Sequence, residues 1–184
     1  MKSYLTENSK VFDFGIGTGK SISKIVESNK NVEIHGVDAS NEMLNFCKRA
    51  YPTVITSKIS DISELRKISG IYDFVISSGA IEFVDQIEEL ISCFYDIVRI
   101  NGILSITYEP IIAFHPVQSE KKSLTIPTQE STYHIDDFYT YRHNPSEFNS
   151  LLVKSGFKIL KDTEFIAYEK SDSKIIYHLV MAKK

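Results

Sequence analysis

The residues best suited to chemistry are an aspartate and three glycines near the start of the chain. Asp13 is followed by Gly15, Gly17 and Gly19 at alternate positions, directly after a short apolar stretch. Glycine lets a backbone turn sharply and approach a ligand where a Cβ atom would collide. The spacing predicts a ligand-binding turn between a strand and a helix, and the alternative is a glycine-rich turn that binds nothing.

Two nucleotide-binding loops fit this stretch less well. The dinucleotide fingerprint needs its third glycine where the chain has Lys20. The phosphate loop ends correctly, in Gly19-Lys20-Ser21, but its first glycine falls on Phe14. An acidic residue followed by three alternating glycines instead resembles motif I of the class I S-adenosylmethionine-dependent methyltransferases. The cofactor of that family carries an ammonium and a sulfonium, which suit an acidic loop better than a triphosphate does.

Later segments resemble the same family in register. Asp38 ends an apolar stretch and corresponds to the carboxylate that holds the ribose, with Met43 against the adenine. Asp61 corresponds to the residue at the adenine amino group, although it could equally cap the helix that follows. The resemblance implies that S-adenosyl-L-methionine is bound by Asp13, Gly15, Ile16, Gly17, Gly19, Asp38, Ala39, Met43, Asp61, Ile62, Ser77 and Ser78.

The resemblance covers about residues 10–109 and implies a doubly wound, Rossmann-like α/β fold. Its sheet is seven-stranded and mostly parallel, in the order 3-2-1-4-5-7-6, with an antiparallel C-terminal strand and helices on both faces. Apolar periodicity and turn residues predict helices at about 20–27, 41–50, 63–68, 86–99 and 144–155. The same patterns predict strands at about 11–14, 32–38, 54–59, 72–78, 103–108, 158–168 and 174–181.

One segment of this single domain, residues 1–184, does not follow the regular pattern. Residues 110–143 combine three prolines with several aromatic residues, after the carboxyl end of the fifth strand. Open α/β sheets bind ligands at that end, and long irregular loops are usually functional. We interpret 110–143 as a lid that replaces the N-terminal helices common in the family. The alternatives are a dimer contact or a disordered excursion.

Methyl transfer is an in-line displacement that depends on positioning, and on a base where the acceptor carries a proton. The family implies no fixed base. Five residues lie where a base is expected: Glu82, Glu109, His115, His134 and His143. We predict catalytic roles for His115, His134 and Glu109, and substrate contacts for Glu82, Tyr133 and Arg142. Arg142 could hold a substrate carboxylate or, equally, an acidic partner within the fold.

Composition limits the classes of partner. The formal net charge of −3 gives no sign of a nucleic-acid surface, and no apolar run reaches the roughly 20 residues of a membrane span. Amino-methyltransferases of nucleic acids generally carry an Asn/Asp/Ser-Pro-Pro-aromatic tetrapeptide where this chain has Ser-Ser-Gly-Ala at 77–80. Cys47 and Cys93 are expected to be packing residues. We expect a cytoplasmic protein with no metal site, and a homodimer is one assembly that the sequence allows.

These observations predict a methyltransferase that moves a methyl group to a hydroxyl, carboxyl or amine of a small molecule. One alternative is a catalytically silent protein that binds S-adenosylmethionine. Another is a phosphate-loop enzyme built on Gly19-Lys20-Ser21, against which Asp13 and Phe14 argue.

Overall fold

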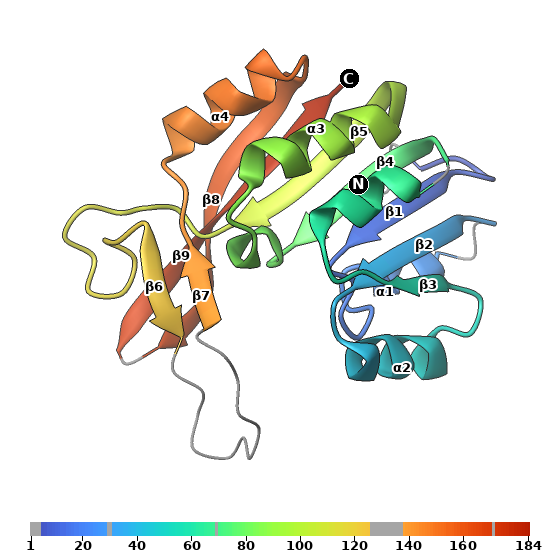
Figure 1. Ribbon diagram of the computed structural model, residues 1–184, viewed down its shortest axis with the longest axis horizontal. Coiled ribbons are helices and arrows are strands. Elements are labelled where there is room, and N and C mark those ends of the chain that lie inside the picture. Colours follow the sequence, from blue (N-terminus) through green and yellow to red (C-terminus); the bar gives the residue numbers. More distant parts are fainter. Residues whose placement is uncertain (1–4, 29–30, 69, 126–137, 171) are drawn as a thin grey trace.

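The computed structural model describes residues 5–28, 31–68, 70–125, 138–170 and 172–184. Seven strands form one sheet, in the order β3-β2-β1-β4-β5-β9-β8 (Figure 1). Their bounds are β1 Lys10–Phe14, β2 Glu33–Asp38, β3 Ile55–Lys58, β4 Tyr72–Ser78, β5 Val98–Tyr108, β8 Lys158–Lys170 and β9 Ser173–Lys183. The first five pair in parallel, and β9 runs antiparallel to both β5 and β8. The predicted fold class and strand order are confirmed.

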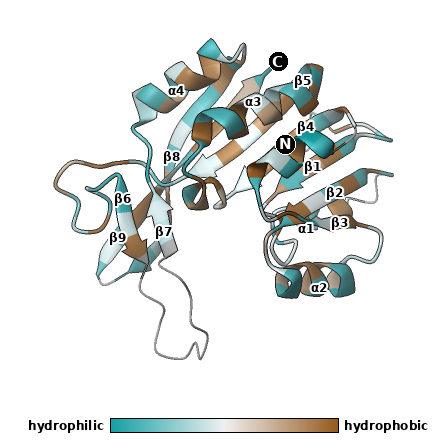
Figure 2. Ribbon diagram, viewed as in Figure 1, coloured by the Kyte–Doolittle hydropathy of each residue, from teal (hydrophilic) through white to brown (hydrophobic). Residues whose placement is uncertain are grey.

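The helices lie on both faces of the sheet because the strands alternate two sets of apolar side chains. On one face, Phe12 and Leu104 belong to a cluster shared with α3 (Ile87–Ile97), α4 (Pro145–Lys154) and the 3₁₀ helix η1 (Ile62–Lys67). On the other, Val11 and Ile103 pack with α1 (Ser23–Val26) and α2 (Asn41–Ala50). Figure 2 shows hydrophobic residues in the central strands and in α3, and hydrophilic ones along much of α2 and α4. Both faces are therefore buried, as parallel strands require.

Several predicted bounds were wrong at the ends of elements. The first helix is a single turn, Ser23–Val26, because residues 17–22 belong to the glycine loop and its exit. The helix predicted at 86–99 ends at Ile97, and β5 begins at once with Val98. The helix predicted at 63–68 is the 3₁₀ helix η1. By contrast, Asn144 caps α4 as its sequence suggests, accepting hydrogen bonds from the amides of Ser146 and Glu147.

The described parts of segment 110–143 contain a small antiparallel hairpin. It is formed by β6 (Lys122–Thr125) and β7 (Phe138–Tyr141), which lie beside the far ends of β8 and β9 in Figure 1. The buried amide side chain of Gln118 holds the preceding loop to β9, since it donates to the carbonyl of Ile176 and accepts from its amide. In the described residues no helix is long and apolar enough to cross a bilayer.

Candidate active site

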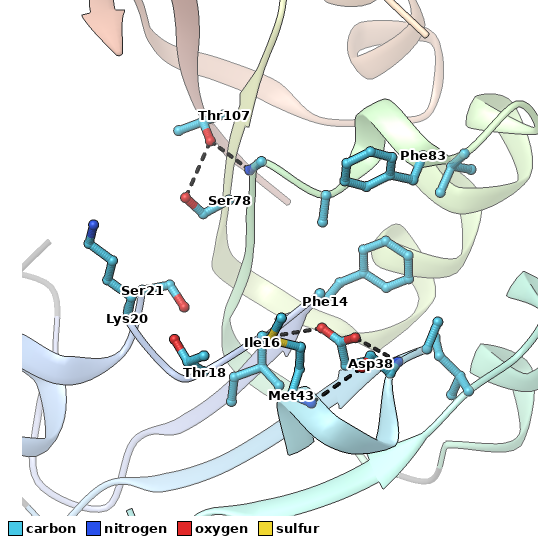
Figure 3. A pocket seen from close by; sticks show the side chains of 18 of the residues that line it. Phe14, Ile16, Thr18, Lys20, Ser21, Asp38, Met43, Ser78, Phe83 and Thr107 are labelled. Carbon is cyan, nitrogen blue, oxygen red and sulfur yellow. Dashed lines mark hydrogen bonds between the residues drawn. The ribbon is translucent and has the colours of Figure 1, made fainter. Parts of the chain in front are cut away.

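A cavity of about 1130 Å³ opens at the edge of the sheet where β1, β2 and β4 end. The register brings these ends together, because Phe14 pairs with both Val37 and Ser77. Figure 3 shows Ile16 of the glycine loop, Asp38 of β2 and Met43 of α2 on one side of the cavity. Residues that follow β4 and end β5 lie opposite. The location is the usual ligand site of an open α/β sheet.

The three glycines of the loop have different reasons to be glycine. All three have positive φ angles, which disfavour other residues. A Cβ atom on Gly15 would lie 2.2 Å from the Cβ of Ala80, and one on Gly19 would lie 2.7 Å from the ring of Tyr51. A Cβ on Gly17 would meet nothing within 4 Å. Glycine is required at positions 15 and 19 because neighbouring protein atoms leave no space for a side chain. Gly17 is the glycine that faces open space.

Asp38 ends β2 inside the cavity and holds the glycine loop in place. Its Oδ2 accepts the amide of Gly17 at 2.8 Å, and its Oδ1 accepts the amide of Ser40 at 2.9 Å. A carboxylate has about four acceptor positions, so these two bonds leave capacity for ribose hydroxyls. The residue thus both orders the loop and presents a negative charge to a ligand.

Asp13 does not line the cavity. It is fully buried behind the loop, where the hydroxyl of Ser21 donates a hydrogen bond to its Oδ2. Burial raises the pKa of this carboxyl to about 7, with the nearby charge of Asp38 acting in the same direction. The sequence places Asp13 in motif I, and the structure gives it a role in shaping the loop rather than in a direct contact.

The remaining predicted cofactor residues include some that line the cavity and some that do not. Asp61 lines the cavity and also caps η1 by accepting the amide of Ser63 at 2.8 Å, a hydrogen-bonded arrangement that lowers its pKa. Both roles considered for Asp61 are thus compatible. The predicted residues that line the cavity are Gly15, Ile16, Gly17, Asp38, Ala39, Met43, Asp61, Ile62 and Ser78. Ser77 is completely buried and, like Asp13 and Gly19, lies outside the lining.

The far end of the cavity is lined by aromatic residues. Phe83 and Thr107 contribute from the central strands and their loops, and Figure 3 shows them across the cavity from Asp38. Phe165, Tyr168 and Tyr177 come from the β8–β9 hairpin; we call these three the aromatic cluster. None of the three was predicted to be a site residue, because nothing in their local pattern distinguishes a strand that closes a ligand site from one that only extends a sheet.

Two buried carboxyls lie behind the aromatic cluster. Glu82 accepts the amide of Glu109 at 3.2 Å and interacts with the hydroxyl of Tyr177. The pKa of Glu82 is raised to about 7, mainly by burial, and the charge of Glu109 acts in the same direction. Burial also raises the pKa of Tyr177, with the Glu82 charge adding to the effect. Glu82 is thus separated from the cavity by Tyr177, which lines it.

Arg142 is an internal partner of Glu109 rather than part of the cavity lining. Its Nε lies 2.6 Å from Oε2 of Glu109, and both side chains are less than 10% exposed. The guanidinium also donates to the Ser123 hydroxyl at 2.9 Å, which ties the residue after β7 to β6. Of the two partners considered for Arg142, the structure shows the acidic residue of the fold, and the expected substrate contact is corrected accordingly. Glu109, also outside the lining, is held by this pair and by the hydroxyl of Tyr168 at 3.4 Å.

The two histidine candidates that the structure describes, His115 and His143, do not line the cavity either. The ring of His115 accepts the amides of Val117 and Gln118 on Nδ1, and its Nε2 lies 3.2 Å from the Lys174 carbonyl. His115 therefore stabilises its own loop. His143 is packed against Tyr108 and Phe148, and burial lowers its pKa to about 4. Tyr133 and His134 lie outside the described residues.

The sheet order, the glycine loop held by Asp38 and the cavity at the strand ends define a class I methyltransferase fold. A family model described as a methyltransferase domain matches residues 11–102, half of the chain. The chain belongs to this family, the S-adenosylmethionine-dependent methyltransferases of class I.

Similar proteins support the assignment. The carboxy-S-adenosyl-L-methionine synthase of Campylobacter fetus subsp. fetus is 27% identical over 145 residues, 76% of this chain and 56% of that protein. The enzyme of the same name from Nautilia profundicola is 26% identical over 108 residues, 56% of this chain and 45% of that protein. The chain thus spans about half the length of these curated relatives. A crystal structure of an S-adenosylmethionine-dependent methyltransferase from Methanosarcina mazei matches with a TM-score of 0.80 at 15% identity, covering 100% of this chain and 95% of that one, which shows the shared fold.

Proposed function

We propose that this protein transfers a methyl group from S-adenosyl-L-methionine to a hydroxyl, carboxyl or amine of a small molecule. The observation that supports this most directly is the continuity of the cavity. Asp38 and Met43 line one end of it, and Tyr168 and Tyr177 line the other. One space can therefore hold a nucleoside and a second reactant side by side, as a displacement reaction requires.

The residues at the first end fit the cofactor. The spare acceptor positions of Asp38 suit the ribose hydroxyls, and the open space at Gly17 admits a ligand close to the backbone. Met43 and Ile62 provide apolar contact for the adenine, and Asp61 provides an acceptor for its amino group. Ser78 and Gly79 lie where the methionine portion would pass. Bound there, the cofactor supplies an electrophilic methyl group.

The protein's own contribution to the reaction is positioning, and the removal of a proton where the acceptor carries one. Good orientation of the reactants lowers the activation free energy by up to roughly 7–11 kcal/mol relative to the bimolecular reaction in water. Tyr177 lines the cavity and its hydroxyl contacts Glu82, whose pKa of about 7 suits proton acceptance near neutral pH. Glu82 acts through Tyr177 and is therefore a positioning residue. It replaces His115 and Glu109 as the source of basicity, because both are engaged within the protein.

A second candidate function follows from the names of the curated relatives. Both are carboxy-S-adenosyl-L-methionine synthases, so formation of a carboxylated cofactor is a specific alternative to methyl transfer. A product with an added carboxylate calls for a cation near the reacting carbon. Among the described residues that line the cavity, Lys20 is the basic one, and it belongs to the glycine loop. This distribution of charge favours methyl transfer.

Incubation with S-adenosylmethionine and pooled small-molecule extracts, followed by mass spectrometry, separates these functions. Methyl transfer predicts S-adenosylhomocysteine that accumulates only when an acceptor is present. Carboxylation predicts a derivative heavier than S-adenosylmethionine, and a silent binder predicts neither product. Asp38→Ala should remove either activity, whereas Glu42→Ala, at an exposed position on α2, should leave it unchanged. The predicted cytoplasmic location and homodimer remain predictions.

A further inference from the structure

The second end of the cavity has a composition that points to one chemical class of acceptor. Phe165, Tyr168 and Tyr177 form the aromatic cluster there, with ring centroids 6.3 Å apart for the pairs Phe165–Tyr177 and Tyr168–Tyr177. The ring planes are inclined by 52° and 58°, so the rings are tilted toward one another rather than stacked. Such an arrangement presents ring faces and edges to a common space, which is the geometry that binds organic cations.

A β-bulge in β8 assembles this cluster. Ile166 pairs with Ile176 on β9, and the next paired residue is Tyr168, with Ile175, so Ala167 is an extra residue. Regular alternation would direct Phe165 and Tyr168 to opposite faces of the sheet. The extra residue restores them to the same face, and both line the cavity. Bulges recur next to active sites because they redirect a side chain in this way.

The charged side chains behind the aromatic cluster are two carboxyls and one guanidinium. Glu82 contacts the Tyr177 hydroxyl, and Glu109 contacts the Tyr168 hydroxyl at 3.4 Å. Arg142 neutralises one of these two carboxyls and is itself 4% exposed, behind the cluster. At this end no lysine or arginine belongs to the cavity lining, as far as the described residues show. A carboxylate acceptor would find no counter-ion there, whereas a cation would find two carboxyls and only one internal counter-charge.

We propose that the methyl acceptor is an amine, held as an organic cation against Phe165, Tyr168 and Tyr177 with the carboxyls of Glu82 and Glu109 behind it. This inference rests on the proposed methyl transfer and narrows its acceptor. The bound ammonium first loses one proton, through the Tyr177 hydroxyl to Glu82. The freed nitrogen electron pair then forms the new N–C bond, while the S–C bond breaks and its electron pair stays on sulfur. An alkylammonium and a thioether result.

The test uses choline and its neutral carbon isostere, 3,3-dimethylbutan-1-ol, as probes. Ligand-observed NMR titrations on the protein saturated with S-adenosylhomocysteine should show choline binding roughly five- to thirtyfold more tightly than the isostere. Phe165→Leu should reduce this preference severalfold. Phe46→Leu is the matched control, because Phe46 lies on α2 outside the cavity and is 45% exposed, against 41% for Phe165. It should leave the preference unchanged.

Two results would overturn the inference while leaving the proposed function intact. One is binding of S-adenosylhomocysteine with no preference for choline, including no binding of either probe. The other is a Phe165→Leu variant that binds S-adenosylmethionine less tightly but binds S-adenosylhomocysteine as before. The aromatic cluster would then contact the sulfonium of the cofactor and not an acceptor. Failure of S-adenosylhomocysteine itself to bind would instead overturn the proposed function, and the inference with it.

Discussion

The amide of Gly17 donates a hydrogen bond to Oδ2 of Asp38, at 2.8 Å, across 21 positions of the chain. This bond links the glycine loop after β1 to the end of β2, so the two motifs position each other. The loop has a second attachment to β2, since the amides of Gly15 and Ile16 both donate to the carbonyl of Val37. The shape of the first end of the cavity therefore depends on the contact between the loop and β2.

Substitution of two loop glycines should separate stability from ligand binding. Gly15→Ala places a Cβ atom 2.2 Å from Ala80, so we expect a loss of several kcal/mol in the free energy of unfolding. Gly17→Ala meets no atom within 4 Å, so only its positive φ is costly, by roughly 1 kcal/mol. Its methyl group would nevertheless occupy cavity space, so we expect the affinity for S-adenosylhomocysteine to fall at least about tenfold. Urea denaturation measures the stability of each variant, and calorimetry measures its affinity for the ligand. Equal destabilisation of both variants would contradict the different roles assigned to Gly15 and Gly17.

The buried carboxyl of Asp13 should make stability depend on pH. Its folded-state pKa, about 7, lies above its ordinary value of 3.8, so the folded protein binds more protons than the unfolded chain between these values. The contribution is fully present below about pH 4 and is lost as the pH rises to 7. Asp13→Asn lacks this term and should gain stability relative to wild type, by on the order of a few kcal/mol, from pH 5 to 8.

Glu82 has a raised pKa of the same sign but is present in both proteins, so its effect cancels in the comparison. Chemical denaturation at several pH values provides the measurement. Parallel stability curves for wild type and Asp13→Asn would show that Asp13 is ionised in the folded protein.

The buried pair Arg142–Glu109 should be far more important for stability than an exposed pair of equal length. Arg142→Met leaves the Glu109 carboxylate buried without its counter-ion, which we expect to cost roughly 3–5 kcal/mol. Adding Glu109→Gln should recover part of that loss. The control is Arg99→Met, because Arg99 and Asp73 are also 2.6 Å apart but Arg99 is 55% exposed. It should cost no more than about 1 kcal/mol.

Denaturant titrations of the four proteins form the test. Similar losses in Arg142→Met and Arg99→Met would mean that burial does not distinguish the two pairs.

The parts of the fold that sequence could predict are those determined by local patterns. The strand order was implied by the resemblance of the strand-end motifs to the methyltransferase family, and the bounds of α2 and the Asn144 cap follow from capping and turn residues. The end of α3 could not be predicted, because Val98 continues its apolar pattern while the backbone of Val98 pairs with Tyr72 of β4. Tertiary pairing overrides local preference there.

The site, too, could be predicted only in part from the sequence. Gly17, Asp38, Met43 and Asp61 could be predicted because each lies at or soon after the end of a strand, in a motif that resembles the family's. The pair Arg142–Glu109 spans 33 positions and depends on how the β6–β7 hairpin packs, which no local pattern encodes. The aromatic cluster depends on the bulge at Ala167, since regular alternation would have separated Phe165 from Tyr168. The usable signal was the cross-strand pairing of Phe165 with Tyr177, which the predicted strands at 158–168 and 174–181 already imply.

The most direct test of the account is a calorimetric titration with S-adenosylmethionine, S-adenosylhomocysteine and ATP–magnesium, on wild type, Asp38→Ala and Glu42→Ala. Wild type and Glu42→Ala should bind the first two ligands and not ATP, and Asp38→Ala should lose at least about tenfold in affinity for both, since it loses the ribose acceptor and the Gly17 anchor. Binding of ATP alone, or equal affinity in Asp38→Ala and wild type, would contradict a cofactor site built on the contact between Gly17 and Asp38.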